Sequence, residues 1–417
     1  MRVYRALRSS ILVAALIGAM ALVPTVAMAK QPPAPTGLVA VITNDPSTSL
    51  DPKPFANRAI SGIAFQINWS DIELTDYVKQ VTQLPGEPPV IKFVPVQGKT
   101  DWTRLDELFA AAQEHNKWVQ LLVYPGFDTP PWALVGVQTH QFPISYGIGV
   151  GDFETLPMPW DPVYLARWFA FVKQLSDRYG DLPAFRMIAS GGPTSESDEF
   201  TEPAGDLSLP NSNPDSVYGT ALQWKVEGYT STKYINAWQQ TFDEYVADFP
   251  NQYISLSWGY GLEINAQGQI SQAQPPLTVQ AILEEASDTL GDQFVLQASD
   301  LTGFQGTTPG SADSVPVQGV IGYIGVAAAT GFQLATNCQD NAKNMGATDN
   351  PPTPPSALTN CIENAIQPDA NGNHVDYVEI YSPDIDAAAD PTLYDGPEMK
   401  AVLEWAKTLF PPPPPEP

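Results

Sequence analysis

The sequence of 417 residues is poor in the side chains that bind metals or form a Ser-His-Asp triad. It holds two cysteines and three scattered histidines. Their spacing matches no zinc-ligand pattern, so we expect no metal site and no cofactor. No Gly-x-Ser-x-Gly segment is present, and no Gly-x-Gly-x-x-Gly turn follows the first apolar run. Both absences argue against a serine hydrolase and a dinucleotide-binding fold.

Basic residues are also scarce. The chain has 20 Lys and Arg against 46 Asp and Glu, a formal net charge of −26. A surface this acidic repels nucleic acid, anionic lipid and acidic polysaccharide. The composition therefore excludes nucleic-acid binding and favours a neutral partner, such as a neutral oligo- or polysaccharide.

Long apolar runs are missing after the N-terminus. The first residues carry Arg2, Arg5 and Arg8, followed by an apolar stretch at 11–23 that is too short for a usual membrane span. Small residues at 27–29 resemble a signal-peptidase site. We predict that residues 1–29 are a secretory signal peptide, with an uncleaved membrane anchor as the alternative. The mature protein is then secreted or periplasmic, has no membrane association, and carries a net charge of −29.

We expect residues 30–410 to form one domain and residues 411–417, PPPPPEP, to be a proline-rich tail. Nothing between them resembles a linker or a repeat, and we expect a monomer. In an oxidising compartment, two cysteines most simply form one disulfide, which predicts a bridge between Cys338 and Cys361.

Apolar runs alternate with helical patterns along the whole domain. We predict eight strands, at residues 38–42, 63–67, 119–124, 185–190, 253–257, 294–298, 320–329 and 375–381. Helical spacing of apolar residues lies between several of them. Nearly continuous apolar strands are typical of a parallel sheet covered by helices. The sequence therefore predicts an α/β fold, a (β/α)8 TIM barrel in a single large domain.

Aromatic and acidic side chains gather where these strands end, which is where a barrel holds its active site. Aromatic rings stack on the C–H faces of sugars, and carboxylates supply acid, base or nucleophile. Glu73 has two interpretations, a sugar ligand or the start of a helix. The predicted substrate-binding residues are Trp69, Asp71, Trp132, Trp258, Asp300 and Tyr381.

Two segments, IAFQINWSDIE and TRLDELFAAAQEHNKWVQLLVYPGFDTPPW, resemble the front half of clan A glycoside hydrolases. The segment PWDPVYLARWFAFVKQLSDRYGD is similar to the helix before the fourth strand of that clan. The resemblance covers roughly residues 38–262. It implies a retaining glycosidase with an acid/base Glu after strand four and a nucleophilic Glu near the end of strand seven.

The loop GGPTSESDEF after the fourth strand lacks the Asn-Glu pair of the clan, and both Glu196 and Glu199 fit the acid position. We prefer Glu199, because its apolar neighbour Phe200 favours burial and a raised pKa. The candidate nucleophile is Glu379, the lone glutamate in VDYVEIY, although it falls on the eighth predicted strand; Asp300, at the end of the sixth, is the alternative. Asp198 is expected to be a supporting or solvated residue.

The sequence therefore predicts an exported glycoside hydrolase that cleaves a neutral glycan with two carboxylates and retains anomeric configuration. The alternative is a catalytically inactive barrel that binds glycans or acts as a scaffold. The missing Asn-Glu pair and the missing seventh-strand acid favour that alternative.

Overall fold

The computed structural model describes residues 31–83, 85, 87–144, 152–203, 220–264, 277–306 and 310–411. All of them belong to one compact unit. The predicted signal peptide and residues 412–417 of the proline tail lie outside the described residues, so both stay predictions. Within the described ranges, every helix is too short or too polar to cross a bilayer.

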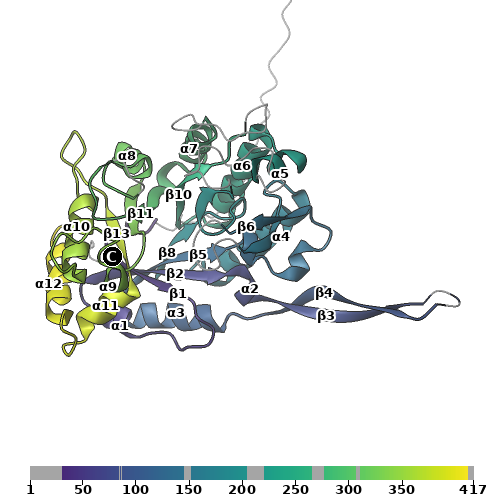
Figure 1. Ribbon diagram of the computed structural model, residues 1–417, viewed down its shortest axis with the longest axis horizontal. Coiled ribbons are helices and arrows are strands. Elements are labelled where there is room, and N and C mark those ends of the chain that lie inside the picture. The colour runs from purple at the N-terminus through teal and green to yellow at the C-terminus, as the bar shows by residue number, and fades with distance from the viewer. Residues whose placement is uncertain are drawn as a thin grey trace, which may run out of the picture. The chain divides into compact units, whose positions relative to one another are not determined.

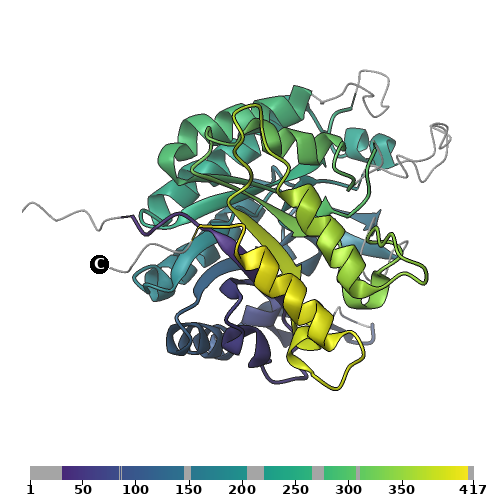
Figure 2. The ribbon, with the colours of Figure 1, turned by 90° about the vertical axis from the view of Figure 1, so that its left-hand side faces the viewer.

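Eight parallel strands close into a barrel, as predicted (Figure 2). The last strand pairs with the first, with Leu38 opposite Val378, and this pairing closes the sheet. The strands are β1 (Gly37–Thr43), β2 (Ile60–Asn68), β5 (Trp118–Tyr124), β8 (Phe185–Ala189), β10 (Tyr253–Gly261), β11 (Phe294–Leu301), β12 (Ala329–Leu334) and β13 (Tyr377–Tyr381).

Helices surround the strands (Figures 1 and 2). In α4 the Asp161 carboxylate caps the first turn by accepting from the backbone N–H of Val163 at 2.8 Å and of Tyr164 at 3.0 Å. Buried residues such as Trp168 and Leu175 recur on one face of that helix. The described helices are α1 (Lys53–Ala56), α2 (Trp69–Ile72), α3 (Thr103–Glu114), α4 (Pro162–Tyr179), α5 (Thr220–Val226), α6 (Ser231–Asp248), α7 (Leu277–Leu290), α8 (Val315–Gly322), α9 (Cys338–Asn341), α10 (Pro354–Ala365), α11 (Ser382–Ala389) and α12 (Gly396–Lys407).

The seventh strand is not where the sequence predicted it. The apolar run 320–329 begins in helix α8, and the strand itself is β12, ATGFQL. Its inward positions are small or polar: a Cβ at Gly331 would meet the Tyr377 ring at 2.2 Å, and Gln333 also lies in the interior. The prediction of strand 320–329 was wrong because the interior selects small and polar residues at this strand.

A long hairpin leaves the barrel after α2. Strands β3 (Glu73–Thr82) and β4 (Val90–Thr100) pair with each other only, in a separate antiparallel sheet. Figure 1 shows them running side by side away from the barrel. Glu73 therefore starts a strand and not a helix, which corrects one of its two predicted interpretations. A second short hairpin pairs β6 (Thr139–Pro143) with β7 (Phe153–Pro157).

Candidate functional site

The interior of the barrel carries a layer of hydrogen-bonded amides. Gln120 of β5 donates to the side-chain oxygen of Gln297 of β11 at 3.1 Å, and the Tyr377 hydroxyl donates to the same oxygen at 2.6 Å. The Gln297 amide in turn donates to Asp198 Oδ2 at 3.1 Å. One side chain thus connects strands β5 and β13 with the loop after β8.

A second pair of amides lies on the other side of this layer. Gln66 of β2 donates to Gln333 of β12 at 3.4 Å, and Gln333 donates to the Tyr381 hydroxyl at 2.9 Å. All of these glutamines are buried. Buried polar groups are costly unless they are hydrogen-bonded, and most of the polar atoms of these glutamines find partners in one another, in Asp198 and in the two tyrosines.

Glu379 points into this interior. It stands on β13 between Tyr377 and Tyr381, while the alternate residues Val378 and Ile380 pack in the outer core. Its side chain is 0 % exposed, and neither carboxylate oxygen accepts a hydrogen bond of ordinary geometry among the described residues. Burial raises the pKa of Glu379 well above its usual value, the charge of Asp198 raises it further, and Gln120 lowers it in part.

Asp198 is the carboxylate whose charge acts on Glu379. The loop after β8 packs tightly, since a Cβ at Gly192 (φ +129°) would meet Trp168 at 2.8 Å. The loop then returns as strand β9 (Glu199–Thr201), which pairs with β10. Asp198 is buried, and burial raises its pKa to about 6 despite the hydrogen bond from Gln297.

The two glutamates that the sequence favoured lie nearer the surface of this loop. Glu199 begins β9, is half-buried, and is one of the charges that raise the pKa of Tyr381. Glu196 is half-buried and raises the pKa of Glu202, a fully buried acid that sequence reasoning missed. Of the acids in this loop, Asp198 and not Glu199 is the one whose charge acts on Glu379.

The three tryptophans that the sequence predicts to stack on sugar rings are largely buried. Trp69 is fully buried and donates from Nε1 to Glu73 at 3.0 Å, which is against a stacking role. Trp258 is also buried, packed on α8 where a Cβ at Gly319 would meet its ring at 2.5 Å. Trp132 is half-buried, and the Arg167 guanidinium lies 5.9 Å from its ring centroid. Trp69 and Trp258 are thus covered, whereas Trp132 lines a cleft at the base of the β3–β4 hairpin.

Three further acids, Asp71, Asp300 and Asp128, lie at or just after the ends of barrel strands. Asp71 accepts a hydrogen bond from Asn44 at 3.0 Å. Both carboxylate oxygens of Asp300 are buried, and burial raises its pKa to about 6. Asp128, in the turn η1 (Gly126–Asp128), was missed by the sequence reasoning; burial, then Asp71 and Glu154, raise its pKa to about 7.

The predicted disulfide is absent from the structure: Cys338 and Cys361 are buried free thiols. They are neighbours, because Cys361 is the main cause of a raised pKa of Cys338. The bridge under oxidising conditions therefore stays a prediction. Among the described residues, no group of His, Cys, Asp and Glu has the arrangement of a metal site.

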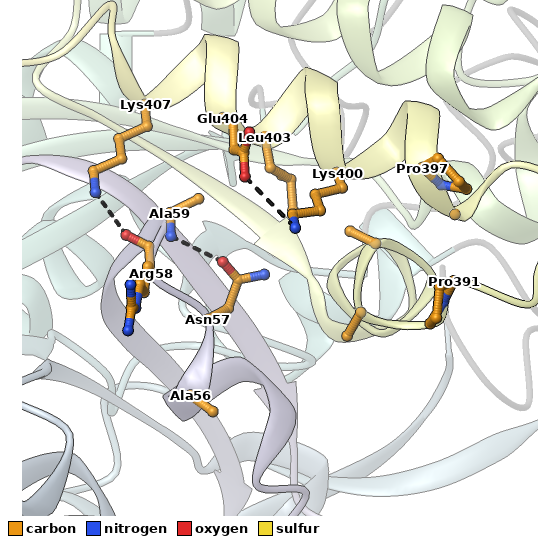
Figure 3. Close-up of a pocket in the computed structure, with 13 residues that line it drawn as sticks. Ala56, Asn57, Arg58, Ala59, Pro391, Pro397, Lys400, Leu403, Glu404 and Lys407 are labelled. Atoms are coloured by element: carbon orange, nitrogen blue, oxygen red, sulfur yellow. Dashed lines mark hydrogen bonds and ion pairs between the residues drawn. The ribbon is translucent and has the colours of Figure 1, made fainter.

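Two clefts open away from the barrel interior. One, of about 820 Å³, lies between α12, the end of α11 and the α1–β2 loop, with Arg58, Lys400 and Lys407 around it (Figure 3). The other, of about 550 Å³, lies at the base of the β3–β4 hairpin and includes Glu73 and Trp132. Neither contains Asp198 or Glu379, so the carboxylate pair, and not cleft size, defines the candidate site.

The fold was compared with solved structures. A β-mannanase from the blue mussel Mytilus edulis is 11% identical over 85% of this chain and 82% of its own, with a TM-score of 0.43. A thermostable xylanase mutant from Cellvibrio japonicus is 8% identical, covering 90% and 98%, with a TM-score of 0.45. A xylanase B from Clostridium stercorarium F9 is 11% identical, covering 83% and 85%, with a TM-score of 0.40. No family model and no curated protein matches the chain. The barrel itself is established by the strand pairing and does not depend on these similarities.

Proposed function

We propose that the chain is a glycoside hydrolase acting on a neutral glycan, with Asp198 and Glu379 as its carboxylate pair. The observation that carries the proposal is the electrostatic interaction of two buried acids inside a (β/α)8 barrel, Glu379 on strand β13 and Asp198 in the loop after β8. The resemblance of residues 38–262 to clan A enzymes is independent support. Asp198 replaces Glu199 in the pair that the sequence predicts.

The environments of the two acids suggest their roles. Glu379 is fully enclosed and the charge of Asp198 raises its pKa further, so it holds the proton that the pair shares and donates it to the glycosidic oxygen as the C–O bond breaks. Asp198, with a pKa of about 6, is ionised at neutral pH. It either attacks the anomeric carbon or activates water. The resemblance to clan A enzymes implies that Glu379 is the nucleophile, whereas this proposal makes Glu379 the acid.

The experiment is a screen of the mature chain against mannan, xylan, galactan and β-glucan, with reducing ends as the readout. Glu379→Gln should abolish release of sugar, whereas Glu363→Gln, an exposed change on α10, should not. The anomeric configuration of the first product, read by NMR, then distinguishes direct attack from water activation. Unchanged hydrolysis by Glu379→Gln would contradict the proposed pair.

A second function is favoured by one observation. Glu379 is wholly covered in this structure, and so is Trp69. A barrel that has kept its polar interior but binds glycans without cleaving them accounts for that coverage. Under this alternative the same glycans bind, as isothermal titration calorimetry would show, and no product forms with the wild-type chain.

A further inference from the structure

The β3–β4 hairpin, called the arm below, contacts the rest of the chain only near its base. Its contacts with other elements are chiefly with α2 and the turn η2 (Pro131–Leu134). At the base, Glu73 accepts from Gln97 at 3.1 Å and from Gln174 at 3.2 Å. Beyond these contacts the arm extends past the barrel (Figure 1). A strand of ten residues spans about 33 Å.

The outer part of the arm exposes large apolar side chains. In an antiparallel pair, directly opposite residues share a face, and the register sets Lys79 opposite Phe93 and Val81 opposite Ile91. Tyr77, two residues before Lys79, is on the same face. The exposed fractions on this apolar face are 58% for Tyr77, 56% for Val81, 49% for Ile91 and 66% for Phe93.

An isolated two-stranded hairpin is only marginally stable in water. Contiguous exposed apolar side chains usually mark a surface that another molecule covers. Both strands of the arm also have a free edge in the sheet of the described residues, and β3 contains no proline to block pairing. Among the residues that the structure describes, the outer part of the arm therefore has no strand or helix packed against it.

We propose that the arm is a dimerisation element and that a second copy of this chain covers its apolar face, arm against arm around a two-fold axis. Lys79 lies in the middle of that face, opposite Phe93. Against lipid or an apolar protein groove, a buried ammonium without a partner is costly. Against a second arm, the ammonium can lie over the ring of Tyr77 or Phe93 of the other copy, a favourable cation–π contact.

The charge distribution supports a second copy for a further reason. Each chain has a formal net charge of −26, so two copies repel each other. The arm, residues 73–100, carries three lysines and three acids, a balance of zero, so it is far less acidic than the rest of the chain. Two arms meeting at their outer parts keep the acidic barrels tens of ångströms apart, well beyond the screening length of about 8 Å at physiological salt.

The area fits a weak dimer. Four large side chains that are each about half exposed offer about 300 Å² of apolar surface per arm. With the surrounding polar atoms, two arms reach the lower size range of specific interfaces, about 1,000 Å². We expect a dissociation constant on the order of 1–100 μM, which replaces the monomer predicted from the sequence.

The test is sedimentation equilibrium of the mature chain over a concentration series. The wild type should dimerise, and the double variant Tyr77→Thr, Phe93→Thr should weaken association at least about 30-fold. Threonine keeps the strand preference of the arm, and circular dichroism checks the fold. The control Val226→Thr, Val326→Thr removes two exposed apolar residues elsewhere and should dimerise like the wild type.

Three results would overturn the proposal. A wild type that stays monomeric at concentrations above about 100 μM would exclude the expected dissociation constant. A double variant that dimerises as tightly as the wild type would show that the interface lies elsewhere. A monomeric wild type that floats with phosphatidylcholine vesicles through Tyr77 and Phe93 would identify a lipid surface as the occupant.

Discussion

Acids on the surface of this protein and acids inside its barrel are held in opposite ways. Asp101 lies at the base of the arm, directly after β4, where hydrogen bonds from Lys99 and Thr103 lower its pKa to about 2. Asp369 lies in the loop before β13, and hydrogen bonds from Asn373 and Asn371 lower its pKa as well. Asp198 and Glu379 are buried, and burial raises the pKa of both.

The difference shows that one count of 46 acids describes two populations. The surface acids are ionised at every physiological pH and account for solubility and charge. The interior acids are destabilised as anions, which costs folding free energy and makes them able to exchange protons near neutral pH. Net charge is thus informative about partners but not about which acids carry chemistry.

The largest expected contrast is in activity. Asp198→Asn should lower kcat/KM on the glycan found by the screen about 10³-fold, because it removes the ionised member of the pair. Asp369→Asn, on the surface, should stay within twofold of the wild type. Steady-state kinetics on folded variants measures both. An Asp198→Asn enzyme with more than a tenth of wild-type activity would return the role to Glu196 or Glu199.

The next contrast is in the pH dependence of stability. Asp128, Asp198 and Asp384 have pKa values raised by burial to about 7, 6 and 7. The folded state therefore binds more protons than the unfolded state between about pH 4 and pH 7, so stability is greatest at the acid end of this window and falls as pH rises through it. Urea unfolding at pH 5 and pH 8 should differ by several kcal/mol. Equal stability at both would show that these acids are solvated.

A smaller effect is expected for one interior acid alone. Asp300→Asn removes an anion whose oxygens are buried, so at pH 8 it should raise the free energy of unfolding by about 1–3 kcal/mol. At pH 4, where Asp300 is protonated in the folded state, the gain should vanish. Denaturant titrations at the two pH values make the measurement, and a loss of stability at pH 8 would mean that the carboxylate has a ligand or cation partner.

The smallest effect belongs to the surface. Asp101→Asn should cost no more than about 0.5–1 kcal/mol at pH 7, since Asp101 is partly exposed, Lys99 is exposed, and solvent screens their pairing. Its lowered pKa makes the contribution present above about pH 4 and absent below about pH 2. Thermal unfolding at pH 7 resolves the difference, and a cost of several kcal/mol would remove the distinction between the two populations.

Much of the barrel could be predicted from apolar runs alone. Seven of the eight predicted runs coincide with barrel strands, because their outward faces pack against helices and are rich in Val, Ile and Leu. The run 320–329 meets β12 only at Ala329. The seventh strand, β12, could not be predicted from apolar residues, because Gly331 and Gln333 interrupt its apolar pattern. The arm was missed for a different reason: its apolar residues are interrupted by polar ones and are exposed on both faces, with no core to bury them.

Only part of the candidate site could be predicted from the sequence. Glu379 stood out as a lone acid in an apolar run, and the structure places it in the interior. The loop after β8 offered several acids within a few residues, and nothing local shows which is buried. That choice depends on Gln297, about a hundred residues further on, whose amide reaches Asp198.

One contact at the base of the arm has a wider consequence. The backbone N–H of Asp101 donates to the carbonyl of Ile72 at 2.7 Å, so the two ends of the arm are already joined beside the barrel. A segment of any length can enter and leave there without moving β2 or α3. This position is therefore an insertion point, where related chains can gain or lose an arm and where a foreign peptide can be grafted into the barrel.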